Sequence, residues 1–185
     1  MPKYRLATPL RTRPAPARYS VSMDELIARL AATPRTLAHL VAEAPDERLD
    51  MAFAGGWSAR TILAHFRDDE YLCMRVALER MLAEDNPALR FIEGAEWEPG
   101  RNRARDRKEW LLADFALQRQ ASLGILRGLR PADWGLHGRT DGGREFTVQQ
   151  FVSSWAAHDA EHVAGLEAAL GETLGEVIAR RARPE

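Results

Sequence analysis

Cysteine is scarce in this sequence, because Cys73 is the single one, and this excludes an intramolecular disulfide framework and fits a reducing cytoplasm. Long apolar runs are lacking too, since no stretch approaches the roughly 18 to 20 residues of a membrane-spanning helix. Neither sign of charge is in excess, because 26 basic and 27 acidic side chains leave a net charge of -1. Such a balance creates no global field that would recruit nucleic acid or an anionic membrane. We therefore expect a cytoplasmic protein that binds neither.

The first twenty residues differ in composition from the rest of the chain. They contain five basic residues, no acidic residue and four prolines, and they lack the apolar segment of a secretory signal. Each proline fixes φ and removes a hydrogen-bond donor, so a regular helix is prevented there. We expect an extended arm over residues 1–20, one domain over residues 21–175 and a charged tail over residues 176–185.

Apolar residues recur with helical spacing through the rest of the chain, and no segment predicts a β-strand. Pro34 interrupts the first apolar stripe, which continues in register beyond it and so indicates one kinked helix. Two long connections, 86–106 and 130–146, separate the later helices. The pattern predicts an all-α four-helix bundle. The predicted helices run from Ser22 to before Pro45, from Ser58 to about Ala83, over about 107–129, and from Thr147 onward.

One stripe of the second predicted helix mixes apolar and polar side chains. His65 and Asp69 are four residues apart, so they are neighbours on one helix face. That face carries the apolar residues of the helix, and both polar side chains are therefore expected to point into the interior. The predicted buried stripe, about 120° wide, contains Ile62, His65, Phe66, Asp69, Leu72, Cys73 and Val76.

Three histidines are predicted to meet in the core. His158 and His162 lie four residues apart on the last helix, where both imidazoles share the face that carries its apolar residues. His65 reaches the same interior from another helix. A buried imidazole needs partners for both ring nitrogens, and one divalent ion would satisfy all three side chains. Neutral imidazoles with open positions suit zinc, nickel or iron(II), while the pattern alone leaves apolar packing of the histidines open.

Other metal sites fit the sequence less well. A zinc protease would have a glutamate directly after the first histidine, whereas this chain has Asp159 there and no predicted sheet. A di-iron bundle would need Glu-x-x-His on two helices at core-facing positions, and the chain offers none. His39 is predicted at the surface and His137 in a glycine-rich loop. Asp69 is interpreted either as a structural ion-pair partner or as an orienter of His65 or of a bound water.

Two segments together resemble the DinB-like superfamily. They are "GGWSARTILAHFRDDE" and "DWGLHGRTDGGREFTVQQFVSSWAAHDAEH", and the resemblance extends over about residues 22–170. It implies a four-helix bundle, often dimeric, whose divalent metal is held by three histidines at the positions of His65, His158 and His162. Gly165 stands where relatives often have glutamine, and Glu161 where some have a histidine, so the substrate class does not follow from the motif.

The resemblance also implies an activity. Characterised relatives include bacillithiol- or mycothiol-dependent S-transferases and a mycothiol-dependent maleylpyruvate isomerase. We therefore expect a metal-dependent thiol S-transferase or a related hydrolase, with zinc or nickel as the ion, iron as an alternative, and a low-molecular-weight thiol as a possible co-substrate. Asp69 and Asp159 are the candidate catalytic residues, as base or as orienter. The alternative is a non-catalytic, dimeric stress protein that binds a metal or a small ligand.

Overall fold

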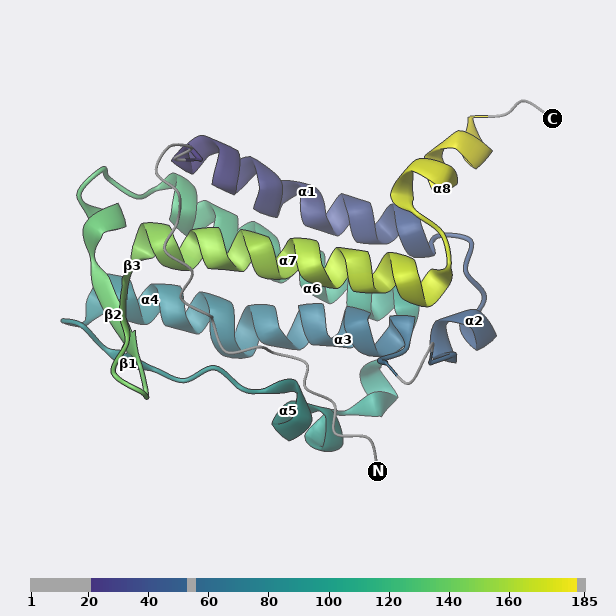
Figure 1. The fold of residues 1–185 in the computed structure, drawn as a ribbon, viewed down its shortest axis with the longest axis horizontal. Helices are drawn as coiled ribbons and strands as arrows, with labels where there is room; N and C mark the ends of the chain where they lie inside the picture. Colours follow the sequence, from purple (N-terminus) through teal and green to yellow (C-terminus); the bar gives the residue numbers. More distant parts are fainter. Residues whose placement is uncertain (1–20, 53–55, 183–185) are drawn as a thin grey trace.

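Four long helical rods lie side by side and form the body of the protein (Figure 1). The computed structural model describes residues 21–52 and 56–182, and the predicted arm over residues 1–20 lies outside this range. The fold confirms the predicted four-helix bundle. Among the described residues, no helix is long and apolar enough to cross a membrane. The rods are α1 (Met23–Val41), α3 (Ala59–Asp69) continued by η1 (Glu70–Met74) and α4 (Arg75–Ala83), α6 (Lys108–Arg127), and α7 (Val148–Leu170).

The helix starts follow the predicted caps. The side chains of Ser22 and Ser58 accept hydrogen bonds from backbone N–H groups three residues ahead. Thr147 and Gln150 form a reciprocal capping box at the start of α7. Pro34 lies inside α1, which runs as one helix through it, as predicted. Local sequence therefore decides where three of the rods begin.

The interior is divided into two apolar clusters with polar side chains between them. One cluster includes Leu37, Phe66, Phe115 and Leu166. The other includes Leu30, Met74, Leu123 and Trp155. Every rod crosses from one cluster to the other, and each contributes a buried polar residue to one hydrogen-bonded group that lies between the clusters. We call these four residues the polar layer: Thr33 from α1, Glu70 from η1, Arg119 from α6 and Asp159 from α7.

A π-helical turn, η1, corrects the predicted stripe of the second rod. Leu72 and Val76 were expected inside, yet they are 44% and 40% exposed. Met74 and Ala77 are buried instead, each one position after a residue of the predicted stripe. A π turn holds one more residue than an α turn, so the buried face moves along the sequence by one position. His65, at the α-helical start of the rod, keeps its predicted inward place.

A small three-stranded sheet also corrects the sequence analysis, which predicted no strand. β1 (Ala88–Leu89) pairs in parallel with β2 (His137–Thr140), and β2 pairs antiparallel with β3 (Glu145–Thr147). The sheet joins the two long connections to each other. A Cβ at Gly138 would lie 2.8 Å from Cδ1 of Leu89, so glycine permits this close approach. Strands of two to four residues are too short for their periodicity to stand out.

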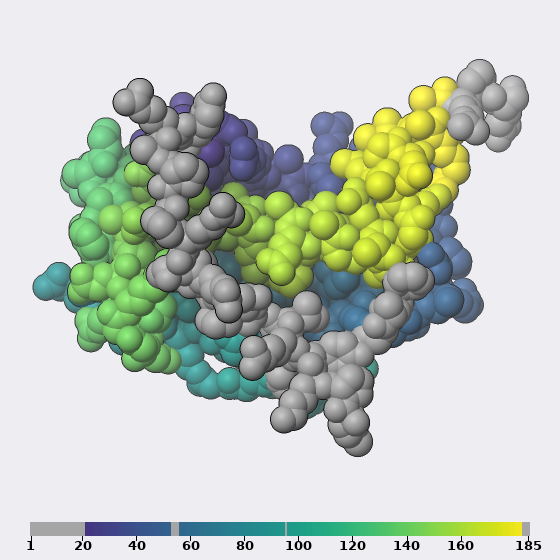
Figure 2. Space-filling view, viewed as in Figure 1, coloured from purple at the N-terminus to yellow at the C-terminus, as the bar shows by residue number. Residues whose placement is uncertain are grey.

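Short helices occupy the remaining segments. α5 (Gly94–Gly100) lies within the connection predicted over 86–106, and it places Trp97 against the bundle. α8 (Leu174–Arg181) projects from one end of the bundle (Figure 2), with Val177 buried at its base. The predicted tail from residue 176 therefore begins inside a helix that packs on α1. The others are α2 (Asp46–Asp50), η2 (Arg103–Arg105) and η3 (Asp133–Gly135).

Candidate metal centre

The structure brings His65, His158 and His162 together between α3 and α7. One potential ligand atom from each lies within 4.8 Å of the others. The Nε2 atoms of His65 and His158 are 3.2 Å apart. Zinc binds imidazole nitrogen at about 2.0–2.1 Å, so two nitrogens of a tetrahedral site stand about 3.3 Å apart. The spacing of these two nitrogens is therefore that of neighbouring ligands on one ion.

Aromatic rings pack against two of the three imidazoles, those of His65 and His162. Trp57 stacks on His162 with an interplanar angle of 10° and 6.2 Å between centroids. Trp97 meets His65 edge-on at 5.3 Å, and its Nε1 donates a hydrogen bond to Asp68. Such a shell limits solvent access and lowers the local dielectric constant, which strengthens electrostatic interactions with a bound ion.

Gly94, at the start of α5, allows Trp57 to take this position. A Cβ on residue 94 would lie 2.6 Å from Cζ2 of Trp57, closer than real contacts allow. We expect Gly94→Ala to displace the indole and weaken zinc binding up to about 10-fold, at the low end of the effect of outer partners. Zinc titration and tryptophan fluorescence would measure the two effects. Gly100→Ala on the same helix is the control, since its Cβ would meet no atom within 4 Å. An equal effect of both variants would contradict the inference that the Cβ at position 94 displaces Trp57.

Two of the imidazoles are held in the neutral form that binds metals. Burial lowers the pKa of His162 to about 3, with the neighbouring His158 adding to the shift. Burial also sets the pKa of His65 well below its ordinary value. For His158 burial acts in the same direction, but the carboxylates of Asp159 and Asp69 outweigh it and raise the pKa. Among the three imidazoles, a proton therefore competes most strongly with an incoming ion at His158.

Acidification is expected to destabilise the ion-free protein. His162 has a pKa of 6.5 when unfolded and about 3 when folded. Between these values the unfolded state binds a proton that the folded state does not, so stability is present above pH 6.5 and lost as the pH falls. The loss is about 1.4 kcal/mol per pH unit from this group, and His65 adds to it.

Urea unfolding in a chelating buffer, between pH 6.5 and about 5, measures that slope. His162→Asn is the matched variant and should have the shallower pH dependence. His158 does not alter the comparison, since its raised pKa gives a contribution that is fully present below 6.5 and lost only at higher pH. Parallel curves for the two proteins would refute the role of His162.

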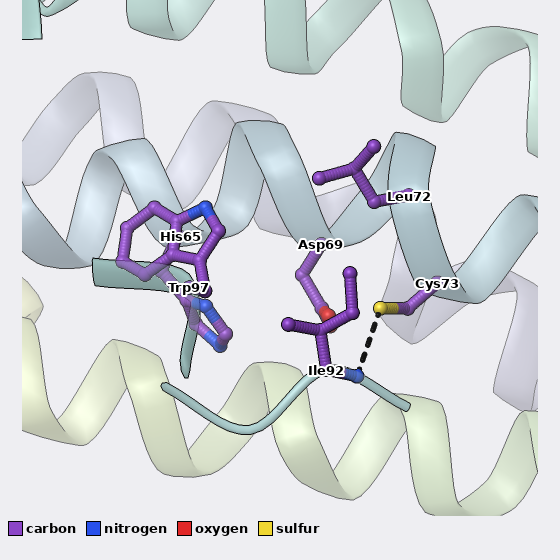
Figure 3. Close-up of a pocket in the computed structure, with 6 residues that line it drawn as sticks. All are labelled: His65, Asp69, Leu72, Cys73, Ile92 and Trp97. Atoms are coloured by element: carbon purple, nitrogen blue, oxygen red, sulfur yellow. Dashed lines mark hydrogen bonds between the residues drawn. The ribbon is translucent and has the colours of Figure 1, made fainter. Parts of the chain in front are cut away.

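Asp69 faces the histidines from the side of a narrow pocket. Its Oδ2 is 3.5 Å from Nε2 of His158, yet its carboxylate is not part of the three-histidine group. Burial raises its pKa, although the charge of His158 opposes the shift. Figure 3 shows Asp69 between His65 and Cys73 along the same rod. The pocket is too narrow to admit a water molecule in this structure, and it is lined by His65, Asp69, Leu72, Cys73, Ile92 and Trp97.

Cys73 does not provide a nucleophile here. Burial, followed by the charge of Asp69, raises the pKa of its thiol to about 12. The sulfur accepts a hydrogen bond from the backbone N–H of Ile92 at 3.5 Å. Since the thiolate is the reactive form, this thiol is a packed, protonated side chain at neutral pH.

Asp159 belongs to the polar layer and does not face the pocket. Its Oδ2 accepts hydrogen bonds from Thr33 Oγ1 and Arg119 Nη1, both at 2.6 Å. Its Oδ1 lies 3.8 Å from Nδ1 of His158, close enough for a charge interaction but too far for a hydrogen bond. Burial alone would raise its pKa, but His158 and Arg119 hold the value below the ordinary one. Arg119 and Thr33 therefore engage both carboxylate oxygens of Asp159 on the side away from the pocket.

The charges around the histidines suit a divalent cation. Asp69, Glu70 and Asp159 are three carboxylates in this region, against the one guanidinium of Arg119. Fully ionised, they leave two negative charges uncompensated, which is the charge that one divalent ion supplies. Burial raises the pKa of Glu70 as well as that of Asp69, and the charge of Asp159 adds a smaller part to each shift.

Sequence reasoning missed Arg119 and Glu70. Arg119 is only 1% exposed, although a charged side chain is rarely expected on the buried face of a helix. The available signal was its spacing, because Arg119 lies four residues after Phe115 and four before Leu123, both buried. His137 lies exposed in β2, and His39 is partly buried near the end of α1; neither belongs to the three-histidine group.

Comparisons with known proteins extend over most of the chain. The sequence model of the DinB superfamily matches residues 29–165. A protein of Oceanobacillus iheyensis named "Putative metal-dependent hydrolase" is 23% identical over 157 residues, covering 78% of this chain and 84% of that protein. YfiT from Bacillus subtilis, described as "a probable metal-dependent hydrolase with an unusual four-helix bundle topology", has a TM-score of 0.75 at 20% identity. This match covers 88% of this chain and 95% of YfiT, and it shows a shared fold.

Proposed function

Because this chain belongs to the DinB superfamily, we propose that it is a divalent-metal-dependent hydrolase with His65, His158 and His162 as ligands. The observation that carries the proposal is the convergence of three imidazoles, two of them held neutral, from two different helices. The names of the two relatives described above support the reaction class. Three nitrogen ligands with open positions favour zinc or nickel, with iron(II) as the alternative.

The proposed ion and the residues around it would have different roles in the reaction. A divalent ion bound there would supply Lewis acidity, which lowers the pKa of a water or thiol that it holds. Asp69 would accept the proton released, since its carboxylate lies beside His158 and its raised pKa makes it a better base than an exposed aspartate. The apolar side chains of Leu72, Ile92 and Trp97 line the narrow pocket beside Asp69, and they would have to move apart to admit an uncharged part of a substrate.

Metal analysis of protein purified without a histidine tag tests the first half of the proposal. We expect about one zinc or nickel ion per chain, as for a preformed site with deprotonated ligands. Less than about 0.2 equivalents, unchanged by His158→Ala, would contradict the metal site. A screen of small esters and amides, with and without chelator, tests hydrolysis. Metal-bound protein without any metal-dependent turnover would favour the non-catalytic binding protein.

Transfer of a low-molecular-weight thiol is the second candidate, and it uses the same centre. The thiol of Cys73 is buried and protonated, so a sulfur nucleophile would have to come from solution. Adding a small thiol and an activated electrophile to the same screen separates the two reactions. Metal-dependent thioether formation that exceeds hydrolysis would favour transfer. Sizing of the protein in solution would test the expected homodimer.

A further inference from the structure

A single buried guanidinium connects the two rods that carry the histidines. Nη2 of Arg119 donates to Glu70 Oε2 at 2.8 Å, and Glu70 directly follows the helix that bears His65. Nη1 and Nη2 of Arg119 also donate to the two carboxylate oxygens of Asp159, at 2.6 and 3.1 Å. Asp159 follows His158 on α7. The guanidinium therefore spans the same gap between rods that the three imidazoles span.

Hydrogen bonds and aromatic rings on several sides hold the guanidinium of Arg119 in a single orientation. Nη1 donates a further hydrogen bond to the backbone carbonyl of Leu30 at 2.9 Å. The guanidinium carbon lies 4.9 Å from the ring centre of Phe115 and 5.2 Å from that of Trp155. With Thr33 bonded to Asp159, all four rods contribute to this one arrangement. A planar donor fork held in this way fixes the carboxylates in angle as well as in distance.

Stability alone does not account for these groups. Replacing a buried ion pair by apolar residues of similar volume is often neutral or stabilising, because desolvation of the charges offsets their attraction. Glu70 moreover opens η1, and π turns inside α-helices are rare and occur frequently at functional sites. The buried ion pairs of Arg119 and the π turn, both unfavourable in free energy by themselves, therefore occur together about one turn beyond His65 and beside His158.

We infer that Arg119 is a positioning residue of the metal centre. It holds the helix of His65 and the helix of His158 and His162 at the separation that a common ion requires, and it acts through Glu70 and Asp159. The inference rests on the proposed metal-binding function. It predicts that loss of Arg119 weakens and distorts metal binding even though its guanidinium touches none of the ligand nitrogens.

Zinc affinity, measured against a chromophoric chelator, and the visible spectrum of the cobalt-loaded protein test the inference. Arg119→Met and Glu70→Gln should bind zinc about 10- to 100-fold more weakly than the unmodified protein, the usual effect of removing partners behind metal ligands. Their cobalt spectra should shift. Arg119→Lys, which keeps the charge but lacks the planar fork, should have an intermediate affinity. Leu126→Ala is the control, since it removes buried apolar volume from the same helix without touching the polar layer.

Specific outcomes would overturn the inference. One is a folded Arg119→Met or Glu70→Gln protein with unchanged zinc affinity and cobalt spectrum. Another is an equal loss of affinity in Leu126→Ala, which would reduce the effect to general destabilisation. If Arg119→Met fails to fold, the zinc affinities of Arg119→Lys and Glu70→Gln test the inference instead, since both variants retain polar groups of similar size. Failure of the unmodified protein to bind zinc or cobalt would instead refute the metal centre and this inference with it.

Discussion

Replacing His158 by alanine is expected to leave a folded protein that no longer holds its ion. His158 provides one of three ligand nitrogens and lies 3.2 Å from another, so its loss leaves only His65 and His162. The zinc affinity should fall by more than the roughly 100-fold that the loss of an outer partner costs. No compensating ligand is expected from Asp69, which lies outside the three-histidine group.

Zinc titration and thermal unfolding together measure this effect. In the unmodified protein, zinc at about 100 times its dissociation constant should add about 2.7 kcal/mol to the unfolding free energy. His158→Ala should gain almost nothing at the same concentration. His137→Ala is the matched control, because His137 is exposed in β2 and should leave zinc binding unchanged. An unaltered affinity of His158→Ala would exclude this histidine from the site.

Asp69→Asn is expected to abolish most of the activity while the ion stays bound. Asparagine has nearly the same size but cannot accept a proton, and loss of a general base typically lowers the rate about 100-fold or more. In the unmodified protein the rate should fall as the pH drops through the raised pKa of Asp69, because only the ionised carboxylate is a base. The variant should lack that limb of the pH profile.

Metal content distinguishes this role from the alternatives. Asp69→Asn should retain about one ion per chain, whereas Asp159→Asn should lose metal affinity first, since Asp159 is bound to Arg119 and Thr33. Turnover is measured with whichever substrate the screen identifies. If Asp69→Asn lost its ion in proportion to its activity, Asp69 would be a ligand and the proposed base would have to be another group.

The parts of the fold that depend on local spacing could be predicted from the sequence. The four rods follow from apolar periodicity, and their starts follow from side chains such as Ser58 and Thr147. His158 and His162 share a helix face by their spacing alone, and His65 was placed inside with its apolar neighbours. These features need only one helix at a time to be recognised.

The parts that depend on several rods at once could not be predicted. An arginine inside an apolar face is unfavourable until Glu70 and Asp159 are known to meet it, and they are 49 and 40 residues away in the chain. The π turn has the same origin, because an ordinary α-helical continuation would have buried Leu72 and Val76. Such features are set by tertiary contacts, which override local propensity.

The polar layer also decides how the rods align lengthwise. Sliding any one rod by a turn would move an ionised or hydroxyl group into an apolar cluster and leave its partners unsatisfied, at a cost of several kcal/mol for each stranded ion. Apolar side chains above and below the layer can be exchanged at similar volume with little penalty. A residue inserted between Phe115 and Arg119, or between Trp155 and Asp159, would break the layer at once. The two apolar clusters can therefore diverge in sequence, whereas insertions and deletions within the rods are restricted because they would misalign the polar layer.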